Sequence, residues 1–540
     1  MRRILSLSLL VLTLSGCLSQ QARHDTAPPA GNDTASTDRT ATTTIAAIQW
    51  SQPDQSGDIC MPPQDIWERI RDGMTLPDHE HAGVRADLEW YASHQGYLDR
   101  VVTRATPYLY LVVEAIEERN LPTELVLLPV VESAYQPFAY SHGRAAGLWQ
   151  FIPGTGRRFD LKQSWWYDGR RDVAAATRAA LDYLEYLRDH FDGEWLLAIA
   201  AYNSGEGTVQ RAVARNKARG KPTDFWSLDL PRETRGYVPK LLAISRLIKD
   251  PEAYGVSLGP VPNEPFLTSV ELDSQIDLAL AAELAEISLE DIYLYNPGFN
   301  RWATDPDGPH ELLLPVERVD TFKQRLADYP PERRVRWERH RVKGGESLLQ
   351  IAQNYHTTVE LLKSVNNLRG NIIRVGDTLT IPVARQKLAS YRLSEEQRLI
   401  TTQNQPRDGR RIDYQVKNGD SLWSIARRYD VGVNELARWN GMAPRDPLLP
   451  GRTLVIWTDA TAEVAAAANP ARFSHPFSSS TRQRIGYTVR SGDSLHAISQ
   501  RFRVSVDNLI SWNKLDSKKV LRPGQRLTLY VDVIQQSGNL

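Results

Sequence analysis

The sequence predicts a multidomain protein in which a mainly α domain is followed by small α+β units with the order strand, helix, helix, strand (βααβ). Three observations predict this fold class. Apolar residues recur at helical spacing between about residues 59 and 259. One short phrase then returns three times at nearly constant spacing. The chain has 540 residues, enough for several domains of ordinary size.

The first residues have the features of an exported lipoprotein. Residues 1–3 are a short positive region, and residues 4–14 form an apolar run too short to span a bilayer. Leu14-Ser15-Gly16-Cys17 resembles a bacterial lipobox, so residues 1–17 are expected to be a lipoprotein signal peptide with Cys17 as the acylated residue. No aspartate follows at the position that suggests inner-membrane retention, which favours an outer membrane lipoprotein facing the periplasm. The alternative is an ordinary secretory signal with an incidental cysteine.

Residues 18–58 are expected to be a flexible tether. They are rich in Thr, Ser, Ala, Asp, Gln and Pro and lack a periodic apolar pattern. The chain has 2 cysteines, so if Cys17 is acylated, Cys60 has no partner within the chain. No disulfide framework is therefore expected.

The helical domain is expected over residues 59–259. Apolar residues three or four apart mark helices that contain the following residues: Trp67 and Ile70; Leu109, Val112, Val113 and Ile116; Leu181, Leu184, Leu187 and Phe191.

Glu132 stands at the end of a strongly apolar run, after Leu127, Leu128, Val130 and Val131. A carboxyl group in such surroundings loses hydration in its charged form, so its pKa should rise toward neutral pH. That is the profile of a general acid. A lone Glu in an apolar segment more often caps a helix or forms an ion pair, so the motifs downstream decide between the two interpretations.

Four short motifs follow in order over about a hundred residues: Glu132-Ser133, Gly147-Leu148-Trp149-Gln150-Phe151, Ala201-Tyr202-Asn203-Ser204-Gly205 and Tyr237-Val238-Pro239-Lys240. They resemble the soluble-lytic-transglycosylase domain, a relative of goose-type lysozyme. The resemblance implies a lysozyme-like catalytic domain that acts on peptidoglycan.

The resemblance implies that Glu132 works alone, whereas most glycoside hydrolases use two carboxylates. Glu132 is expected to protonate the oxygen of the β-1,4 bond between N-acetylmuramic acid and N-acetylglucosamine. The ionised Glu132 then takes the proton of the muramyl C6 hydroxyl, which attacks C1 and closes a 1,6-anhydro ring. No water is consumed, so the implied enzyme is a peptidoglycan lyase, cutting at strand ends or inside strands.

The same resemblance implies roles for further residues. Ser141 and Gln150 are expected to orient the muramyl sugar, together with Ser133, Tyr202 and Asn203. Tyr237 is expected to lie against Glu132 and help to set its pKa. Gly147 and Gly205 are expected to allow close backbone approach or unusual dihedral angles.

A second carboxylate facing Glu132 would make the enzyme a lysozyme-type hydrolase instead. Asp168, Asp172 and Glu206 are the candidates from the sequence. Asp168 is expected in a turn or ion pair and Glu206 at a helix start. Hydrolysis stays the alternative, and a non-catalytic peptidoglycan-binding lipoprotein is a further one.

The C-terminal half carries three copies of one phrase. Their turn glycines, Gly345, Gly419 and Gly492, are 74 and 73 residues apart, and each is followed 21 residues later by an asparagine: Asn366, Asn440 and Asn513. A further glycine follows in each copy, at positions 376, 451 and 524.

This pattern resembles the LysM module, a βααβ fold that binds chains of N-acetylglucosamine. The three modules are expected at 337–383, 412–458 and 485–531, with polar linkers at 384–411 and 459–484 that let them fold as independent beads. Three weak sites on one chain would add avidity for a polymer. With these repeats, the chain looks like the membrane-bound lytic murein transglycosylase D type.

A fainter copy is expected at 265–330, as a degenerate LysM-like domain with a more structural role. Aligning Asn296 with Asn440 also brings the apolar positions into register. The turn glycine is replaced by Gln275, and an insertion at 298–310 lengthens the loop.

Charge and motifs exclude several other function classes. Lys+Arg and Asp+Glu both number 65, so net charge gives no reason to expect nucleic acid. The 11 histidines are scattered, and the cluster at residues 78–81 is expected to be solvated surface, so no metal is predicted. No phosphate loop or nicotinamide fingerprint stands out, so no cofactor is predicted. The expected partners are glycan strands, with the membrane reached only through the lipid anchor.

Overall fold

We describe the protein from a computed structural model, which describes residues 64–458, 482–489, 493–502, 506–513, 515, 521 and 524–532. The predicted signal peptide, lipidation site and tether lie outside these residues, as do Cys60, Gly492 and most of the linker at 459–484. Within the described part, no helix is both long enough and apolar enough to cross a membrane.

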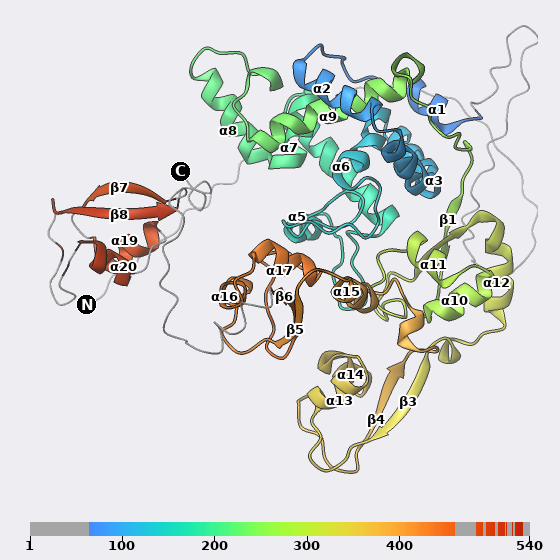
Figure 1. Ribbon diagram of the computed structural model, residues 1–540. Helices are drawn as coiled ribbons and strands as arrows, with labels where there is room; N and C mark the ends of the chain where they lie inside the picture. Colours follow the sequence, from blue (N-terminus) through green and yellow to red (C-terminus); the bar gives the residue numbers. More distant parts are fainter. Residues whose placement is uncertain are drawn as a thin grey trace, which may run out of the picture. The chain divides into compact units, whose positions relative to one another are not determined.

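Residues 64–259 form a helical domain, as the sequence predicts (Figure 1). Its elements are α1 (Ile66–Asp72), α2 (Ala82–Ala92), α3 (Gln95–Glu117), η1 (Thr123–Leu127), α4 (Leu128–Ser133), α5 (Pro153–Arg158), α6 (Val173–His190), α7 (Trp195–Ser204), α8 (Glu206–Lys217), η2 (Phe225–Ser227), α9 (Arg232–Lys249) and η3 (Glu252–Tyr254).

Helix α7 is the centre of this domain. Residues 196–201 are all buried, and the helix packs against α6, α8 and α9. A helix that is apolar on every side is stable only when neighbours surround it. The ends of α7 are therefore held firmly, which matters because two predicted site residues stand at its C-terminal end.

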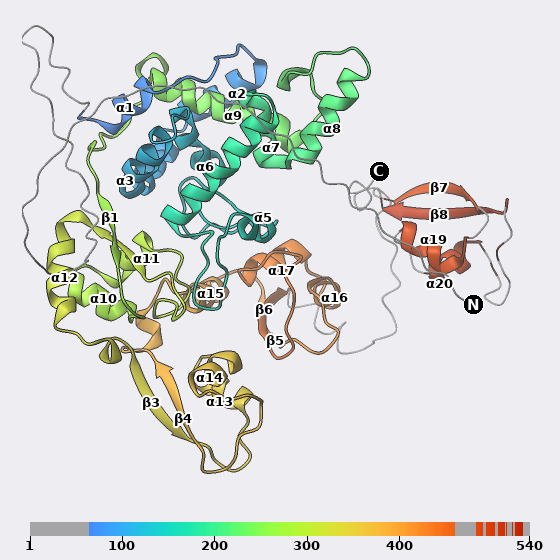
Figure 2. The ribbon, with the colours of Figure 1, turned by 180° about the vertical axis from the view of Figure 1, so that it is seen from behind.

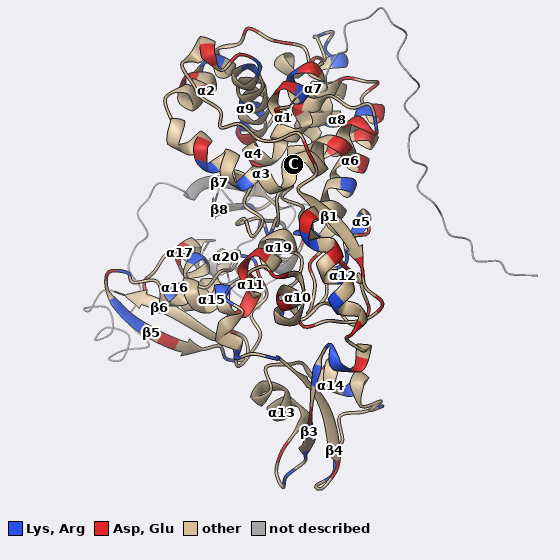
Figure 3. Cartoon of the chain, turned by 90° about the vertical axis from the view of Figure 1, so that its right-hand side faces the viewer, with Lys and Arg blue, Asp and Glu red and all other residues tan. Residues whose placement is uncertain are grey.

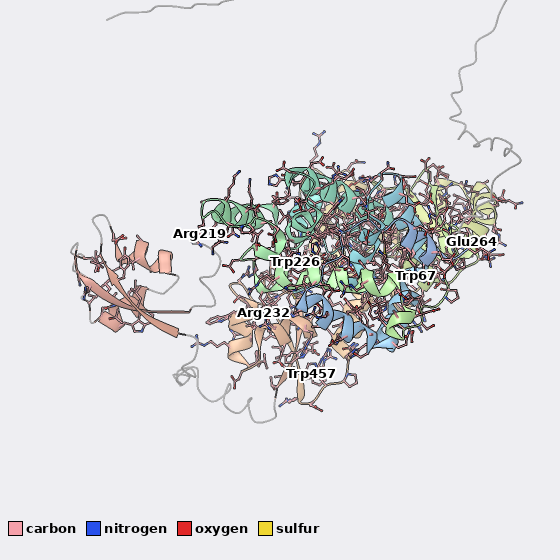
Figure 4. All side chains as sticks on the ribbon, turned by 90° about the horizontal axis from the view of Figure 1, so that it is seen from above. Trp67, Arg219, Trp226, Arg232, Glu264 and Trp457 are labelled. Atoms are coloured by element: carbon pink, nitrogen blue, oxygen red, sulfur yellow. The ribbon has the colours of Figure 1, made fainter. Side chains whose placement is uncertain are left out.

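The surface of this domain carries charges of both signs, and Figure 3 shows acidic and basic residues interspersed over its helices. Asp78 and Glu80 of the predicted solvated cluster pair with Arg246, and the rings of His79 and His81 contact Trp226. Trp226 is labelled in Figure 4. Within the described residues, no group of three or more His, Cys, Asp or Glu is arranged to hold a metal ion.

Four βααβ units follow, each with one antiparallel strand pair. The first consists of β1 (Leu267–Glu271), α10 (Leu278–Ala285), α11 (Leu289–Tyr295) and β2 (Glu311–Pro315), so the segment predicted as a degenerate copy has the predicted order. Helix α12 (Val319–Ala327) follows it, flanked by η4 (Val316–Arg318) and η5 (Pro331–Arg333).

The three clear repeats have the same order. The first repeat contains β3 (Arg336–Arg341), α13 (Leu348–Asn354), α14 (Val359–Val365) and β4 (Thr378–Val383). The second contains β5 (Arg410–Gln415), α16 (Leu422–Arg428), α17 (Val433–Trp439) and β6 (Thr453–Thr458). The third contains β7 (Arg482–Thr488), α19 (Leu495–Phe502), α20 (Val506–Asn513) and β8 (Arg526–Asp532).

The recurring asparagine fastens the second helix of each unit to its closing strand. In the second repeat, the side-chain amide of Asn440 donates to the carbonyls of Leu436 and Val455, and its oxygen accepts from the Val455 N–H at 2.7 Å. The equivalent hydrogen bonds are made by Asn296, Asn366 and Asn513. The residue that defines the repeat in the sequence therefore has a structural role in all four units.

The segment 384–411 differs from the predicted polar linker. It contains η6 (Leu388–Ser390) and α15 (Glu395–Asn404), and Tyr391 between them is fully buried. The Tyr391 hydroxyl donates to the buried carboxyl of Asp277, which caps α10. In Figures 1 and 2, α15 lies beside the second repeat, where Gln403 donates to Asn440. The first and second repeats are therefore not separated by a free linker.

Candidate active site

Glu132 lies in the short helix α4, directly after the 3-10 helix η1. Pro129 stands in the first turn of α4, where the missing N–H costs nothing. Ala134 has a left-handed backbone, with φ 50°, and ends the helix. Leu127, Leu128 and Val130 before Glu132 are buried, whereas Glu132 itself is partly exposed. Its carboxyl group is therefore held by the core but can be reached from outside.

Tyr237 of α9 lies against Glu132. Its hydroxyl donates a hydrogen bond of 2.6 Å to Oε1 of Glu132. Burial raises the pKa of Glu132 to about 7, against the effect of the Tyr237 hydrogen bond, which lowers it. The sequence predicted both the neighbour and the direction of the pKa shift. At neutral pH, a large fraction of Glu132 is protonated and can donate a proton.

Tyr202 and Asn203 stand in the last turn of α7. The Tyr202 hydroxyl donates to the Trp149 carbonyl at 2.8 Å, which fixes the motif around Gln150 to α7. The side-chain oxygen of Asn203 accepts from Thr234 of α9 at 2.8 Å. Burial, followed by the charge of Glu132, raises the pKa of Tyr202 well above its ordinary value. Tyr202 is therefore a neutral hydroxyl close to Glu132.

The remaining predicted residues hydrogen-bond to backbone. Ser133 is buried and its hydroxyl is within hydrogen-bonding reach of the Leu148 carbonyl, at 2.9 Å. Gln150 has a left-handed backbone, with φ 49°, and its amide donates to the Gly147 carbonyl. The Ser141 hydroxyl accepts from the N–H groups of Gly143 and Ala145. Among the described residues, no hydrogen bond joins Ser133, Ser141 or Gln150 to Glu132.

The two glycines that were predicted to have unusual backbone dihedral angles have them. Gly147 has φ 81°, and a Cβ added there would lie 2.0 Å from the Arg170 carbonyl oxygen. Gly205, between α7 and α8, has φ 82°. Any other residue at position 147 would push apart the two segments that meet there.

The three candidate second carboxylates are engaged elsewhere. Burial would raise the pKa of Asp168, but its ion pairs with Arg170 and Arg171 hold that pKa below its ordinary value. Asp172 caps α6 by accepting from the Ala175 N–H. Glu206 binds Arg158 at 2.9 Å. The predicted ion pair of Asp168 and helix-start position of Glu206 are confirmed.

Glu233 is a further residue close to the site that no sequence motif identifies. This exposed carboxylate stands in the first turn of α9, and its charge adds to the rise in the pKa of Glu132. It precedes Tyr237 by four residues, so both lie on the same face of α9. Once Tyr237 is expected beside Glu132, this spacing is the feature of the sequence that could have placed Glu233 near Glu132 as well.

Family models match in the same order as these elements. Residues 111–225 match the transglycosylase SLT domain, and residues 340–382, 414–457 and 487–529 match the LysM domain. Residues 266–330 match the LysM-like domain of lytic transglycosylase MltD. Membrane-bound lytic murein transglycosylase D of Escherichia coli is 38% identical over 415 residues, which cover 74% of this chain and 87% of that protein.

The chain belongs to the membrane-bound lytic murein transglycosylase D family. It is a peptidoglycan lytic transglycosylase with a helical SLT domain followed by LysM modules.

More distant relatives share only parts of the chain. An autolysin of Enterococcus faecalis is 32% identical over 34% of this chain and 24% of that protein. Among solved structures, an inactive mutant of the lytic transglycosylase Slt from Pseudomonas aeruginosa is 25% identical, with a TM-score of 0.22. It covers 29% of this chain and 25% of that chain.

Proposed function

We propose that Glu132 is the single catalytic acid and base of this transglycosylase. The observation that supports it most is the partly buried carboxyl group with a pKa of about 7, held by the Tyr237 hydroxyl at 2.6 Å. A pKa near the working pH lets one group donate and then accept a proton within a single turnover. The engagement of Asp168, Asp172 and Glu206 with other groups supports the single-carboxylate reaction over hydrolysis.

In this mechanism, protonated Glu132 gives its proton to the oxygen of the bond between N-acetylmuramic acid and N-acetylglucosamine as that bond breaks. The Glu132 carboxylate then takes the proton of the muramyl C6 hydroxyl, whose oxygen bonds to C1. The products are a free N-acetylglucosamine end and a 1,6-anhydromuramyl end, and Glu132 is protonated again. Tyr237 stabilises the ionised carboxyl group between the two steps.

The other predicted residues divide into two groups by their hydrogen bonds. Ser133 and Tyr202 contact the carbonyls of Leu148 and Trp149, so we assign them to holding the Gln150 motif in place. Gln150, Asn203 and Ser141 are assigned to the muramyl sugar. Each has a partly exposed side chain with hydrogen-bonding capacity left after the contact described above.

Glu132→Gln tests the mechanism, because the amide keeps the shape of the side chain but cannot donate the proton. The measurement is mass spectrometry of sugars released from isolated sacculi. We expect wild-type products with muramyl ends lighter by one water than hydrolysis products, and no release by the variant. Full activity in Glu132→Gln would refute the mechanism.

Glu233→Gln is the matched control and also tests hydrolysis. Glu233 is the carboxylate whose charge affects Glu132, so it is the candidate for activating a water molecule. We expect this variant to keep releasing 1,6-anhydromuramyl ends at a rate within a few-fold of the wild type. Reducing muramyl ends from the wild-type protein would establish a lysozyme-type hydrolase.

The LysM repeats are proposed to bind N-acetylglucosamine chains of the same substrate. Large apolar side chains stand exposed in the described repeats, among them Leu349 at 61% in the first and Trp423 at 56% in the second. Such surfaces suit the apolar faces of sugar rings. Trp423→Ala should weaken binding of soluble N-acetylglucosamine oligomers, and unchanged affinity would exclude Trp423 from the site.

Lipidation at Cys17 and attachment to the periplasmic face of the outer membrane complete the proposal. The lipobox resemblance supports both, and the family relationship supports a place in the cell envelope. Metabolic labelling with a palmitate analogue should mark the wild type and not Cys17→Ala. Labelling of both proteins alike would refute acylation at this cysteine.

A further inference from the structure

A cavity of about 920 Å³ lies apart from Glu132. Its wall comes from the loops at 136–140 and 163–171 of the catalytic domain, from residues 300 and 301 of the LysM-like unit, from residues 356 and 357 of the first repeat, from α15 and from the second repeat. A volume of this size is that of an ordinary ligand pocket. The cavity exists because the segment 384–411 packs against these units instead of forming a free linker.

The carboxylates in the wall already have partners. Asp168 accepts two hydrogen bonds from Arg170, at 2.9 and 2.7 Å. Glu395 pairs with Arg301 at 2.9 Å, and Glu396 with His356 at 3.1 Å. Asp446 of the second repeat binds Arg144 at 2.7 Å and Tyr140 at 3.1 Å.

The arginines in the wall outnumber these carboxylates. Arg170, Arg171, Arg301, Arg398 and Arg452 line the cavity. Arg171 reaches Asp168 only at 3.7 Å, beyond hydrogen-bonding distance, and donates to the neutral Asn300 at 3.0 Å. Among the described residues, Arg398 and Arg452 form no ion pair. The cavity therefore has an excess of positive charge.

Arg398 is the centre of this excess. Its guanidinium lies 4.2 Å from the centre of the Phe138 ring and donates to the Leu393 carbonyl. Burial, followed by the charge of Arg171, lowers the pKa of Arg398 to about 9. The carboxylate of Glu395, whose charge also acts on Arg398, is already paired with Arg301. A guanidinium in these surroundings gains free energy when a further anion binds, and a planar carboxylate fits its paired N–H groups.

We propose that this cavity binds a carboxylate of the peptide stem carried by the muramyl sugars of the substrate, with Arg398 and Arg171 as the binding residues. The inference rests on the proposed function, since it names a further part of the same substrate. Phe138, Ala139 and Tyr140 line the cavity, and Ser141, assigned to the muramyl sugar, follows directly. The loop thus links a sugar site to a site for the peptide attached to that sugar.

The test compares glycan strands that carry peptide stems with the same strands after an amidase has removed the stems. We expect the wild-type chain to have a higher kcat/KM on stem-bearing strands. Arg398→Gln should lower the ratio of the two kcat/KM values about tenfold, the loss typical of one charge-assisted hydrogen bond. Arg398→Lys should restore part of the ratio, and the exposed Arg392→Gln should leave it unchanged.

Direct binding is measured by calorimetry with the free tetrapeptide stem, with acetate and with phosphate. Tighter binding of the stem than of acetate, lost in Arg398→Gln, supports the proposal. Equal binding of phosphate and stem would show a general anion site and overturn it. Loss of cleavage on both kinds of strand in Arg398→Gln would show a structural role and also overturn it. Normal cleavage of stripped strands, with no stem preference in the wild type, would leave the function of Glu132 intact and refute this inference.

Discussion

Two opposing effects set the proton affinity of the Glu132 carboxyl group. Burial among the apolar residues of η1 and α4 favours the neutral form, and the short hydrogen bond from Tyr237 favours the charged form. The result is a pKa of about 7. Because only the protonated group can begin the reaction, cleavage should fall as the pH rises through about 7.

Tyr237→Phe should move this alkaline fall to higher pH. The hydroxyl lowers the pKa of Glu132, so its removal raises that pKa, by about one unit if a charge-assisted hydrogen bond of about 1.5 kcal/mol is lost. The rate should also drop, because the ionised carboxyl group loses its stabilising donor. The measurement is the pH dependence of kcat for release of anhydromuropeptides. Tyr202→Phe is the control, since its hydroxyl donates to the Trp149 carbonyl. A fall at the same pH in Tyr237→Phe would contradict the assignment.

Among individual residues, the sequence predicted Glu132 and its neighbour Tyr237 but not Glu233. The apolar residues around Glu132 are its neighbours in the sequence, so they predict the direction of the shift in the pKa of Glu132. Tyr237 lies 105 residues away and was found only through the family resemblance. Glu233 has no distinguishing motif, and its effect on Glu132 depends on how α9 lies against α4, which requires the fold.

At the scale of elements, the asparagine of each βααβ unit satisfies backbone hydrogen-bonding groups of the closing strand. Each unit has only two strands, so the closing strand lacks a second neighbour on one side. The asparagine side chain supplies one donor and one acceptor to that strand, as a further strand would. The degenerate unit keeps Asn296 although its turn glycine is replaced by Gln275. The degenerate unit therefore retains the asparagine hydrogen bonds although its turn sequence has changed.

Asn440→Ala should destabilise the second repeat by about 2 to 4 kcal/mol, because it leaves buried N–H and C=O groups of Val455 and Leu436 without partners. Hydrogen exchange of the full chain, followed by mass spectrometry, should show faster exchange in β6 and α17. Asn434→Ala removes an exposed asparagine from the same helix and should leave β6 protected. Equal protection in both variants would mean that the Asn440 hydrogen bonds contribute little.

The segment 384–411 shows where sequence patterns are insufficient. It has few apolar residues and no strong helical period, so a polar linker was the reasonable prediction. What orders it is Tyr391, whose partner Asp277 lies 114 residues earlier in the chain. Asp277 also accepts from the backbone N–H groups of Arg385 and Ala279. A single long-range contact between a tyrosine and a buried carboxylate produces no periodic pattern in the sequence, so the sequence could not predict it.

At the scale of the molecule, Tyr391 belongs to a core that connects the catalytic domain with the LysM-like unit. The core that contains Tyr391 also includes Trp166 and Tyr167 of the catalytic domain and much of the LysM-like unit. The insertion at 298–310 contributes to it, since the Asn300 N–H donates to the Trp166 carbonyl. The LysM-like unit and the start of segment 384–411 therefore support the catalytic loop at 163–171.

Two truncations separate support of the catalytic domain from substrate binding. A chain ending at residue 404 keeps Tyr391 and α15, whereas a chain ending at residue 383 loses both, and each keeps only the first clear repeat. Loss of a fully buried aromatic side chain costs about 3 to 5 kcal/mol, so the shorter chain should unfold at a temperature several degrees lower. Both should bind insoluble peptidoglycan less tightly than the full chain, because both lack the second and third repeats. Calorimetry measures the unfolding temperature, and sedimentation with sacculi measures binding.

If both truncated chains unfold at the same temperature, the Tyr391 anchor does not stabilise the catalytic domain. If the truncated chains bind sacculi as tightly as the full chain, the missing repeats do not hold the enzyme on its substrate.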